Sequence, residues 1–208
     1  VNGTCGVNCS LHLRKKGINK QGDTVMRSSI LMPFLTAFVG CLLVFNFALA
    51  YQGNKVPEDK RSSLGLYFSA QEAFDYLQFN ANKTLFLDVR DPAEITKSGT
   101  PTIIDANVPS KFRISEDPEF GHEHEGYKFN REFVRDVDAR LSAKGLSKSD
   151  VVILLCDCGR RASKAVDKLK KAGYTNVVTV VDGYKGWRKK KLPTTKNLDK
   201  SKMYSPTR

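Results

Sequence analysis

Five consecutive apolar residues, Val151 to Leu155, are the feature that most restricts how this chain can fold. A strand with one face in water alternates apolar and polar residues, whereas a strand buried on both faces is apolar throughout. A run of this length is typical of a strand and is shorter than an ordinary helix. It therefore predicts an inner strand of a sheet that is covered on both faces.

Apolar residues before and after this run switch between helical and strand spacing along the chain. Ser69 can cap a helix whose apolar residues follow at i, i+3, i+4 and i+7, and Gly145 and Gly173 end two later helices. Strands are expected at 84–89, 102–108, 151–155 and 176–181, and a last short helix is expected around a core Trp187. Strands that alternate with helices form a parallel sheet. We therefore expect one α/β domain over residues 64–193, with a central parallel sheet and helices on both faces.

Residues 30–50 contain no charged side chain. Such a run is either a membrane span or the apolar part of a secretory signal. Met26-Arg27 stands directly before it, and Ala48-Leu49-Ala50 closes it with the small-x-small pattern that signal peptidase accepts. We interpret residues 26–50 as a signal peptide or, if uncleaved, as a membrane anchor, and residues 1–25 as upstream sequence read through to a start placed too early.

Basic residues before the apolar run keep that side of the chain in the cytoplasm. The rest of the chain is therefore expected to be exported to the periplasm, or to face the periplasm from a membrane anchor at residues 30–50. Cys5, Cys9 and Cys41 then belong to the removed or anchoring part, which leaves Cys156 and Cys158 in the exported domain. Two cysteines are too few for a disulfide scaffold.

The chain carries a formal net charge of +12, and part of the excess lies in the basic run 188–191 and in the polar C-terminal tail 194–208. Residues 51–63 are also polar and read as a linker. A basic run can bind nucleic acid, but no nucleic-acid motif accompanies this one. We interpret it as a solvated helix end and expect no nucleic acid as a partner. The overall composition excludes a disordered, collagenous or polytopic membrane protein.

The predicted inner strand is followed by Cys156 and by a short loop that leads into a helix. In open α/β sheets, ligands bind beyond the carboxyl ends of strands, where helix N-termini present free N–H groups. These groups and the helix dipole favour a thiolate over a thiol. Arg160 and Arg161 add positive charge, and Gly159 allows a tight turn. The pattern predicts a lowered pKa for the Cys156 thiol and a loop suited to an anion on its sulfur.

Four segments, in their order along the chain, resemble a rhodanese domain. They are Leu87-Asp88-Val89-Arg90 with its continuation to Glu94, the Cys156–Arg161 loop, Ala172–Val177, and Asp182-Gly183 through Gly186-Trp187. The resemblance covers about residues 64–193. Residues 105–109 are also similar to a subgroup of exported single-domain rhodaneses, which agrees with the signal peptide.

This resemblance implies a sulfurtransferase that moves a sulfane sulfur through a persulfide on Cys156 to cyanide or a thiol acceptor. It implies that the persulfide anion is held by a loop comprising Asp157, Cys158, Gly159, Arg160, Arg161 and Ala162, which Arg161 closes. Asp88 and Arg90 match the family's Asp-x-Arg and are expected to brace the site. A phosphatase family that shares the fold has one residue more between Cys and Arg, so this loop fits sulfur better than phosphate.

The loop departs from the family pattern at Asp157 and Cys158. A basic or neutral polar residue often follows the family's cysteine, and a carboxylate there would repel thiosulfate by about 1–2 kcal/mol at an effective dielectric constant of about 20. Cys158 is either a small core residue or a resolving thiol that forms an easily reduced disulfide within the loop. The second alternative would make the protein a redox or sulfide-handling binding module that uses Cys156 and Cys158.

The sequence holds one further candidate for a metal site, His122-Glu123-His124-Glu125. Glycines flank it in a polar stretch, so we interpret it as a solvated loop. We expect neither a metal nor a cofactor. The expected partners are a small sulfur-containing donor and a thiol or cyanide acceptor.

Overall fold

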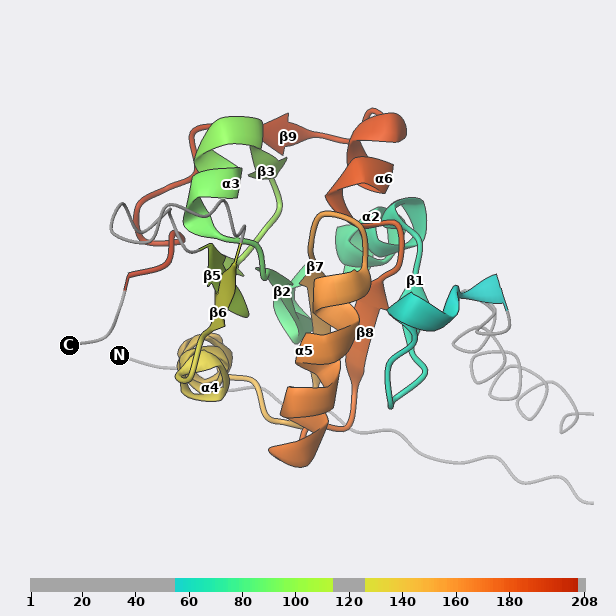
Figure 1. The fold of residues 1–208 in the computed structure, drawn as a ribbon, viewed down its shortest axis with the longest axis vertical. Helices are drawn as coiled ribbons and strands as arrows, with labels where there is room; N and C mark the ends of the chain where they lie inside the picture. The colour runs from blue at the N-terminus through green and yellow to red at the C-terminus, as the bar shows by residue number, and fades with distance from the viewer. Residues whose placement is uncertain (1–54, 114–125, 206–208) are drawn as a thin grey trace, which may run out of the picture. The chain divides into compact units, whose positions relative to one another are not determined.

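The structure is a computed structural model that describes residues 55–113 and 126–205 (Figure 1). The segments interpreted as read-through and as signal or anchor, and the His122–Glu125 stretch, lie outside the described residues. Within the described ranges, no helix combines the length and the apolar character needed to span a membrane.

Across the described residues, five parallel strands form the central sheet, in the order β1-β8-β7-β2-β4. The strands are Tyr67–Phe68 (β1), Thr84–Asp88 (β2), Ala106–Asn107 (β4), Val151–Leu155 (β7) and Val177–Val180 (β8). The apolar run β7 lies in the centre, and its residues from Val152 onward are buried. Both the α/β class and the inner position of this strand are therefore confirmed.

Helices cover both faces of the sheet, as expected. Helices α2 (Ala70–Asn80) and α6 (Gly183–Lys189) pack on one face, and α4 (Phe133–Ala143) and α5 (Arg160–Lys171) pack on the other. Figure 1 shows α5 lying in front of β7. Successive side chains of a strand point to opposite faces. Ile153 and Leu155 therefore contact the α2 side, whereas Leu154 and Cys156 contact the α5 side.

The short elements complete the chain between these helices and strands. They are the 3-10 helices Glu58–Lys60 (η2) and Ala81–Lys83 (η3), the helix Pro92–Ser98 (α3), and the strands Thr100–Pro101 (β3), Lys111–Arg113 (β5), Tyr127–Phe129 (β6) and Thr194–Thr195 (β9). Strands β5 and β6 form an antiparallel hairpin that sequence spacing did not predict. Its first strand is tied to the domain by the Asp91 carboxylate, which accepts the N–H of Arg113 at 2.8 Å.

Two predicted local features are confirmed by side-chain contacts. Ser69 caps α2, because its hydroxyl accepts the N–H of Glu72 at 3.2 Å while the Glu72 carboxylate accepts the N–H of Ser69 at 2.7 Å. Trp187 is fully buried and contacts the rings of Phe74 and Phe86. The short final helix therefore contributes the largest side chain of the α2-side core.

The strand expected over 102–108 is wrong in its first half. Only Ala106–Asn107 joins the sheet as β4, and β3 instead pairs antiparallel with β9. Between them, the N–H of Ile104 bonds back to the carbonyl of Pro101 at 3.3 Å and closes a turn. The turn buries Ile104 in the α2-side core. The apolar residues that suggested a strand at this position are therefore buried by a turn instead of by an extended backbone.

Both polar flanks pack on the domain. Val56, in the segment interpreted as a linker, is buried with Tyr67 and Val181. In the C-terminal tail, the carbonyl of Lys202 accepts the N–H of Asn107 at 2.7 Å, so the tail covers the open edge of β4. Arg140 holds the same segment, because its guanidinium donates to the carbonyls of residues 201 and 203. An edge strand without such cover is a site for aggregation.

We predict that a chain ending at Leu198 is less stable than one ending at Ser205. Loss of these hydrogen bonds removes about 2 kcal/mol, which lowers the Tm by about 5 °C for a domain of this size. Thermal unfolding followed by circular dichroism measures the difference. Equal melting temperatures for the two chains would show that the tail contributes nothing to the edge of β4.

Candidate active site

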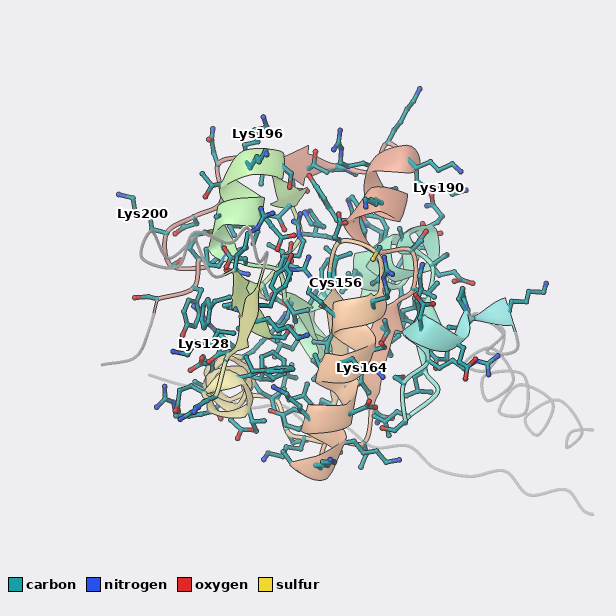
Figure 2. All side chains as sticks on the ribbon, in the orientation of Figure 1. Lys128, Cys156, Lys164, Lys190, Lys196 and Lys200 are labelled. Atoms are coloured by element: carbon teal, nitrogen blue, oxygen red, sulfur yellow. The ribbon has the colours of Figure 1, made fainter. Side chains whose placement is uncertain are left out.

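Cys156 lies directly after β7 and faces the start of α5 (Figure 2). Its Sγ accepts the backbone N–H of Gly159 at 3.1 Å and that of Ala162 at 3.4 Å. The residue is fully buried. The loop residues that the sequence predicted thus surround the sulfur with backbone donors at the positive end of a helix.

Two glycines allow this loop to approach its neighbours. Gly159 has a φ of 93°, and a side chain there would collide with the backbone of Val181. Gly183 has a φ of 60°, and a side chain there would collide with the Cys156 carbonyl. That carbonyl accepts the N–H of Tyr184 at 2.7 Å. The start of α6 therefore supports the same loop from the other side.

The predicted lowering of the Cys156 pKa is wrong for this structure. Burial raises the pKa of the thiol, and the N–H groups of Ala162, Cys158 and Gly159 and the charge of Arg161 offset that rise only in part. The free-energy cost of removing the thiolate from water exceeds the stabilisation that these hydrogen bonds and the nearby positive charge provide. At neutral pH the group is therefore a thiol.

Cys158 behaves in the opposite way. It is partly exposed, and although its burial acts to raise the pKa, hydrogen bonds from the side chain and the N–H of Arg160 and the charge of Arg160 lower it. Both cysteines are free. The more exposed thiol of the loop is thus also the more acidic one.

Arg161 is held by a carboxylate that sequence reasoning did not single out. Its two terminal nitrogens donate to the two oxygens of Glu94 at 2.5 and 2.6 Å. Burial acts to raise the pKa of Glu94, but the hydrogen bond and charge of Arg161 lower it. Glu94 also accepts the N–H of Asp91 and so belongs to the capping box of α3. The pair fixes α5 against α3, so Arg161 positions the loop rather than offering a free charge to an anion.

Asp88 and Arg90 form a buried ion pair with an Nη2–Oδ2 distance of 2.6 Å. The carboxylate also accepts the hydroxyl of Thr100 at 2.8 Å, and the guanidinium donates to the carbonyl of Gly99 at 2.7 Å. The guanidinium lies over the ring of Tyr184, 4.1 Å from its centre. Because Tyr184 binds the Cys156 carbonyl, this pair supports the loop indirectly, as a brace.

Asp157 has a partner that reduces the expected repulsion of anions. The ammonium of Lys185 lies 2.8 Å from its carboxylate, in a pair that is exposed on the lysine side. Arg160 forms a longer contact of 3.6 Å with Asp59 at the surface.

No local pattern marks Lys185, because its partner is distant in the sequence. The sequence does hold a signal at Glu94, because Asp91 and Glu94 have the spacing of a capping box. That spacing predicts the start of a helix and says nothing of the contact with Arg161.

In the described ranges, no cluster of three or more histidine, cysteine, aspartate or glutamate residues could hold a metal ion. The site itself presents one buried thiol, one partly exposed thiol, and the N–H groups and charges around them.

A family model described as "Rhodanese-like domain" matches residues 72–190. The chain is 33% identical over 109 residues to thiosulfate sulfurtransferase 16, chloroplastic, of Arabidopsis thaliana, which covers 52% of this chain and 78% of the relative. It is 31% identical over 107 residues to senescence-associated protein DIN1 of Raphanus sativus, which covers 51% of this chain and 50% of the relative. The alignment thus spans about half the length of the second relative.

Solved structures with a similar arrangement include Rv0390 from M. tuberculosis, at 21% identity and a TM-score of 0.47, covering 63% of this chain and 97% of that chain. Another is the polysulfide-sulfur transferase homodimer from Wolinella succinogenes, at 20% identity and a TM-score of 0.43. The match covers 77% of this chain and 90% of that chain. The matched family segment includes Cys156 and its whole loop and covers more than half of the 208 residues. The chain therefore belongs to the rhodanese-like domain family.

Proposed function

We propose that this protein is a sulfurtransferase that carries a sulfane sulfur as a persulfide on Cys156 and passes it to cyanide or a thiol. The observation that carries the proposal is the position of Sγ, which accepts two backbone N–H groups at the start of α5. The same donors suit the terminal sulfur of a persulfide, which is an anion over a wider pH range than a thiol. Family membership and a relative named as a thiosulfate sulfurtransferase support the proposal.

The reaction consists of two displacements at sulfur. The Cys156 thiolate attacks the outer sulfur of thiosulfate, a new S–S bond forms, and sulfite leaves with the electron pair of the bond that breaks. Cyanide then attacks the outer sulfur and leaves as thiocyanate, which returns the Cys156 thiolate. A thiolate acceptor leaves as a persulfide by the same displacement. Neither step needs an external oxidant or reductant.

The residues around Cys156 have separate parts in this scheme. The N–H groups of Gly159 and Ala162 hold the charge on sulfur. The Arg161–Glu94 pair keeps α5, and with it these donors, in place. The Asp157–Lys185 pair lies beside the loop at the surface and sets the charge that an anionic donor meets.

The central test is the intact mass of the full chain before and after thiosulfate, and again after cyanide. We expect a gain of about 32 Da that cyanide removes, because one sulfur atom is added to the thiolate and then transferred. Cys156→Ala is expected to show no gain, and Cys158→Ser is the matched control that retains it. A gain that persists in Cys156→Ala would contradict the proposal.

The alternative of a redox module has one observation in its favour, the lowered pKa of Cys158 beside Cys156 in the same loop. The same mass measurement separates the two functions. A loss of about 2 Da that a reductant reverses, in place of the gain, would identify a disulfide between the two thiols.

The two thiols are expected to react at different pH. The pKa of Cys156 is raised by burial, so its thiolate fraction at neutral pH is small and keeps increasing above the ordinary thiol value of about 8.5. The pKa of Cys158 is lowered, so its reactivity reaches a plateau at a lower pH. Rates of iodoacetamide labelling, measured on Cys156→Ser and Cys158→Ser by mass spectrometry, give the two profiles. Half-maximal labelling of Cys156 at a lower pH than that of Cys158 would refute this order.

The Asp157–Lys185 pair is expected to set the use of anionic donors. Asp157→Asn should raise kcat/KM for thiosulfate about threefold, and Lys185→Gln should lower it about threefold, because charges at an exposed position are partly screened. A monoanionic thiosulfonate donor is the control, since it feels about half of the effect. Equal responses with both donors would show that Asp157 acts through something other than charge.

A further inference from the structure

Three lysines and two aromatic rings lie beside the candidate active site on a surface that we call the basic face. It comprises Lys111, Tyr127 and Phe129 of the β5–β6 hairpin, which share one face of the paired strands, and Lys164 and Lys168 of α5. Figure 2 shows Cys156 at the loop end of α5, with Lys164 further along that helix. Lys164 follows the first residue of α5 by about 6 Å along the helix axis, so the face begins close to the loop.

The aromatic rings of the basic face are unusually exposed and contact its cations. Phe129 is 54% exposed and Tyr127 is 41% exposed. The ammonium groups of Lys111 and Lys168 lie over the Phe129 ring, 4.4 and 4.5 Å from its centre. The Arg161 guanidinium lies 5.6 Å from the centre of the Tyr127 ring. These contacts join the hairpin to α5 and to the residue that positions the Cys156 loop.

The positive charge of the basic face is not neutralised within the described part of the chain. None of its three lysines forms an ion pair with a carboxylate of residues 55–113 or 126–205. The pKa of Lys168 is lowered, first by burial and then by the like charge of Lys111. A surface that holds like charges together in this way gains free energy when an anionic partner covers it.

The composition of the basic face favours a protein over other polyanions. Tyrosine and phenylalanine are enriched at protein interfaces, and lysines around such rings can meet acidic side chains of a partner. A single-stranded nucleic acid would stack its bases on free rings, but the Phe129 ring is already occupied by two ammonium groups. A lipid surface offers no thiol to the adjacent Cys156. Lys164 and Lys168 are about 6 Å apart along α5, which is close to the distance between alternate side chains of an extended peptide.

We propose that the basic face docks an acidic segment of a partner protein that carries the acceptor thiol for sulfur on Cys156. The transfer step rests on the proposed function, whereas docking depends only on the charges and rings of the face. In that step the partner's thiolate attacks the outer sulfur of the Cys156 persulfide. The new S–S bond forms on the partner, and the bond to Cys156 breaks with its electron pair, which leaves a thiolate.

The test measures docking without sulfur transfer. A fluorescein-labelled 12-residue peptide with glutamate at alternate positions and one cysteine is titrated with the full-length Cys156→Ser protein, and anisotropy gives the Kd. The matched peptide has glutamine in place of glutamate. We expect binding of the glutamate peptide only, with a Kd that rises as salt is added, since exposed charges are screened.

The variant that tests the basic face is Lys164→Glu with Lys168→Glu, the two α5 lysines whose spacing matches alternate side chains of an extended peptide. Its control is Lys190→Glu with Lys196→Glu, which makes the same change in net charge at two lysines that Figure 2 shows on another part of the molecule. Reversing two charges that contact the peptide should raise the Kd about tenfold or more, whereas the control should change it less than about twofold. In a Cys156 protein loaded with sulfur, the rate of transfer to the peptide thiol should fall in parallel in the test variant.

Separate readouts distinguish the failure of docking from the failure of the proposed function. Absence of the 32 Da gain on Cys156 would remove the transfer step and leave the binding result intact. Equal Kd changes in the two double variants would overturn the docking proposal, as would tighter binding of an oligouridylate or of anionic vesicles through the same lysines. Residues 114–125 carry five carboxylates, at positions 116, 117, 119, 123 and 125. The same titration is repeated on a protein in which these five carboxylates are changed to amides. If the peptide binds only to that protein, the docking proposal is overturned, because the occupant of the basic face is then the chain's own acidic segment.

Discussion

Cys156 accepts hydrogen bonds at both its sulfur and its carbonyl, and the rest of the site is arranged around these bonds. The sulfur accepts the N–H groups of Gly159 and Ala162, and the carbonyl accepts that of Tyr184. The start of α5 and the start of α6 therefore converge on one residue at the end of the innermost strand. Because each bond is made by the backbone, the geometry depends on where the helices begin rather than on any one side chain. The two glycines of positive φ are required at these approaches.

Three ion pairs surround this centre, and their burial separates their roles. Asp88 and Arg90 are fully buried, and such a pair is stable only if further hydrogen bonds compensate the loss of water. The hydroxyl of Thr100 and the carbonyl of Gly99 supply them, which makes the pair a rigid brace. The Arg161 pair is partly buried and joins two helices. The Asp157 pair is largely exposed, so it adds little rigidity and instead places two opposite charges at the surface beside the loop.

The acidity of the two cysteines follows from the same arrangement. The sulfur of Cys156 accepts two backbone N–H groups, but it is also fully removed from water. Burial therefore raises its pKa and favours the thiol form. Cys158 keeps contact with solvent and with Arg160, whose hydrogen bonds and charge lower the pKa of its thiol. A helix N-terminus alone is thus a poor guide to thiol acidity, because burial can outweigh it. Beside this centre, the basic face of the hairpin and α5 presents charge that the described part of the chain leaves unpaired.

The apolar run Val151–Leu155 predicted the inner strand, the cap at Ser69 predicted the start of a helix, and the spacing of Cys156 and Arg161 indicated the loop, because each pattern depends on residues close in the sequence. The turn before β4, the β5–β6 hairpin and the packed C-terminal tail were not predictable, since their bonds join distant segments and their apolar patterns are short.

The same limit applies to the site. Local spacing placed a cysteine at a helix start, but only the tertiary structure decided that it is buried, that Glu94 holds Arg161 and that Lys185 holds Asp157. Sequence by itself determined which chemical groups stand at the strand end. Their charge states and partners were decided by the packing, because both depend on exclusion of water and on contacts across the fold.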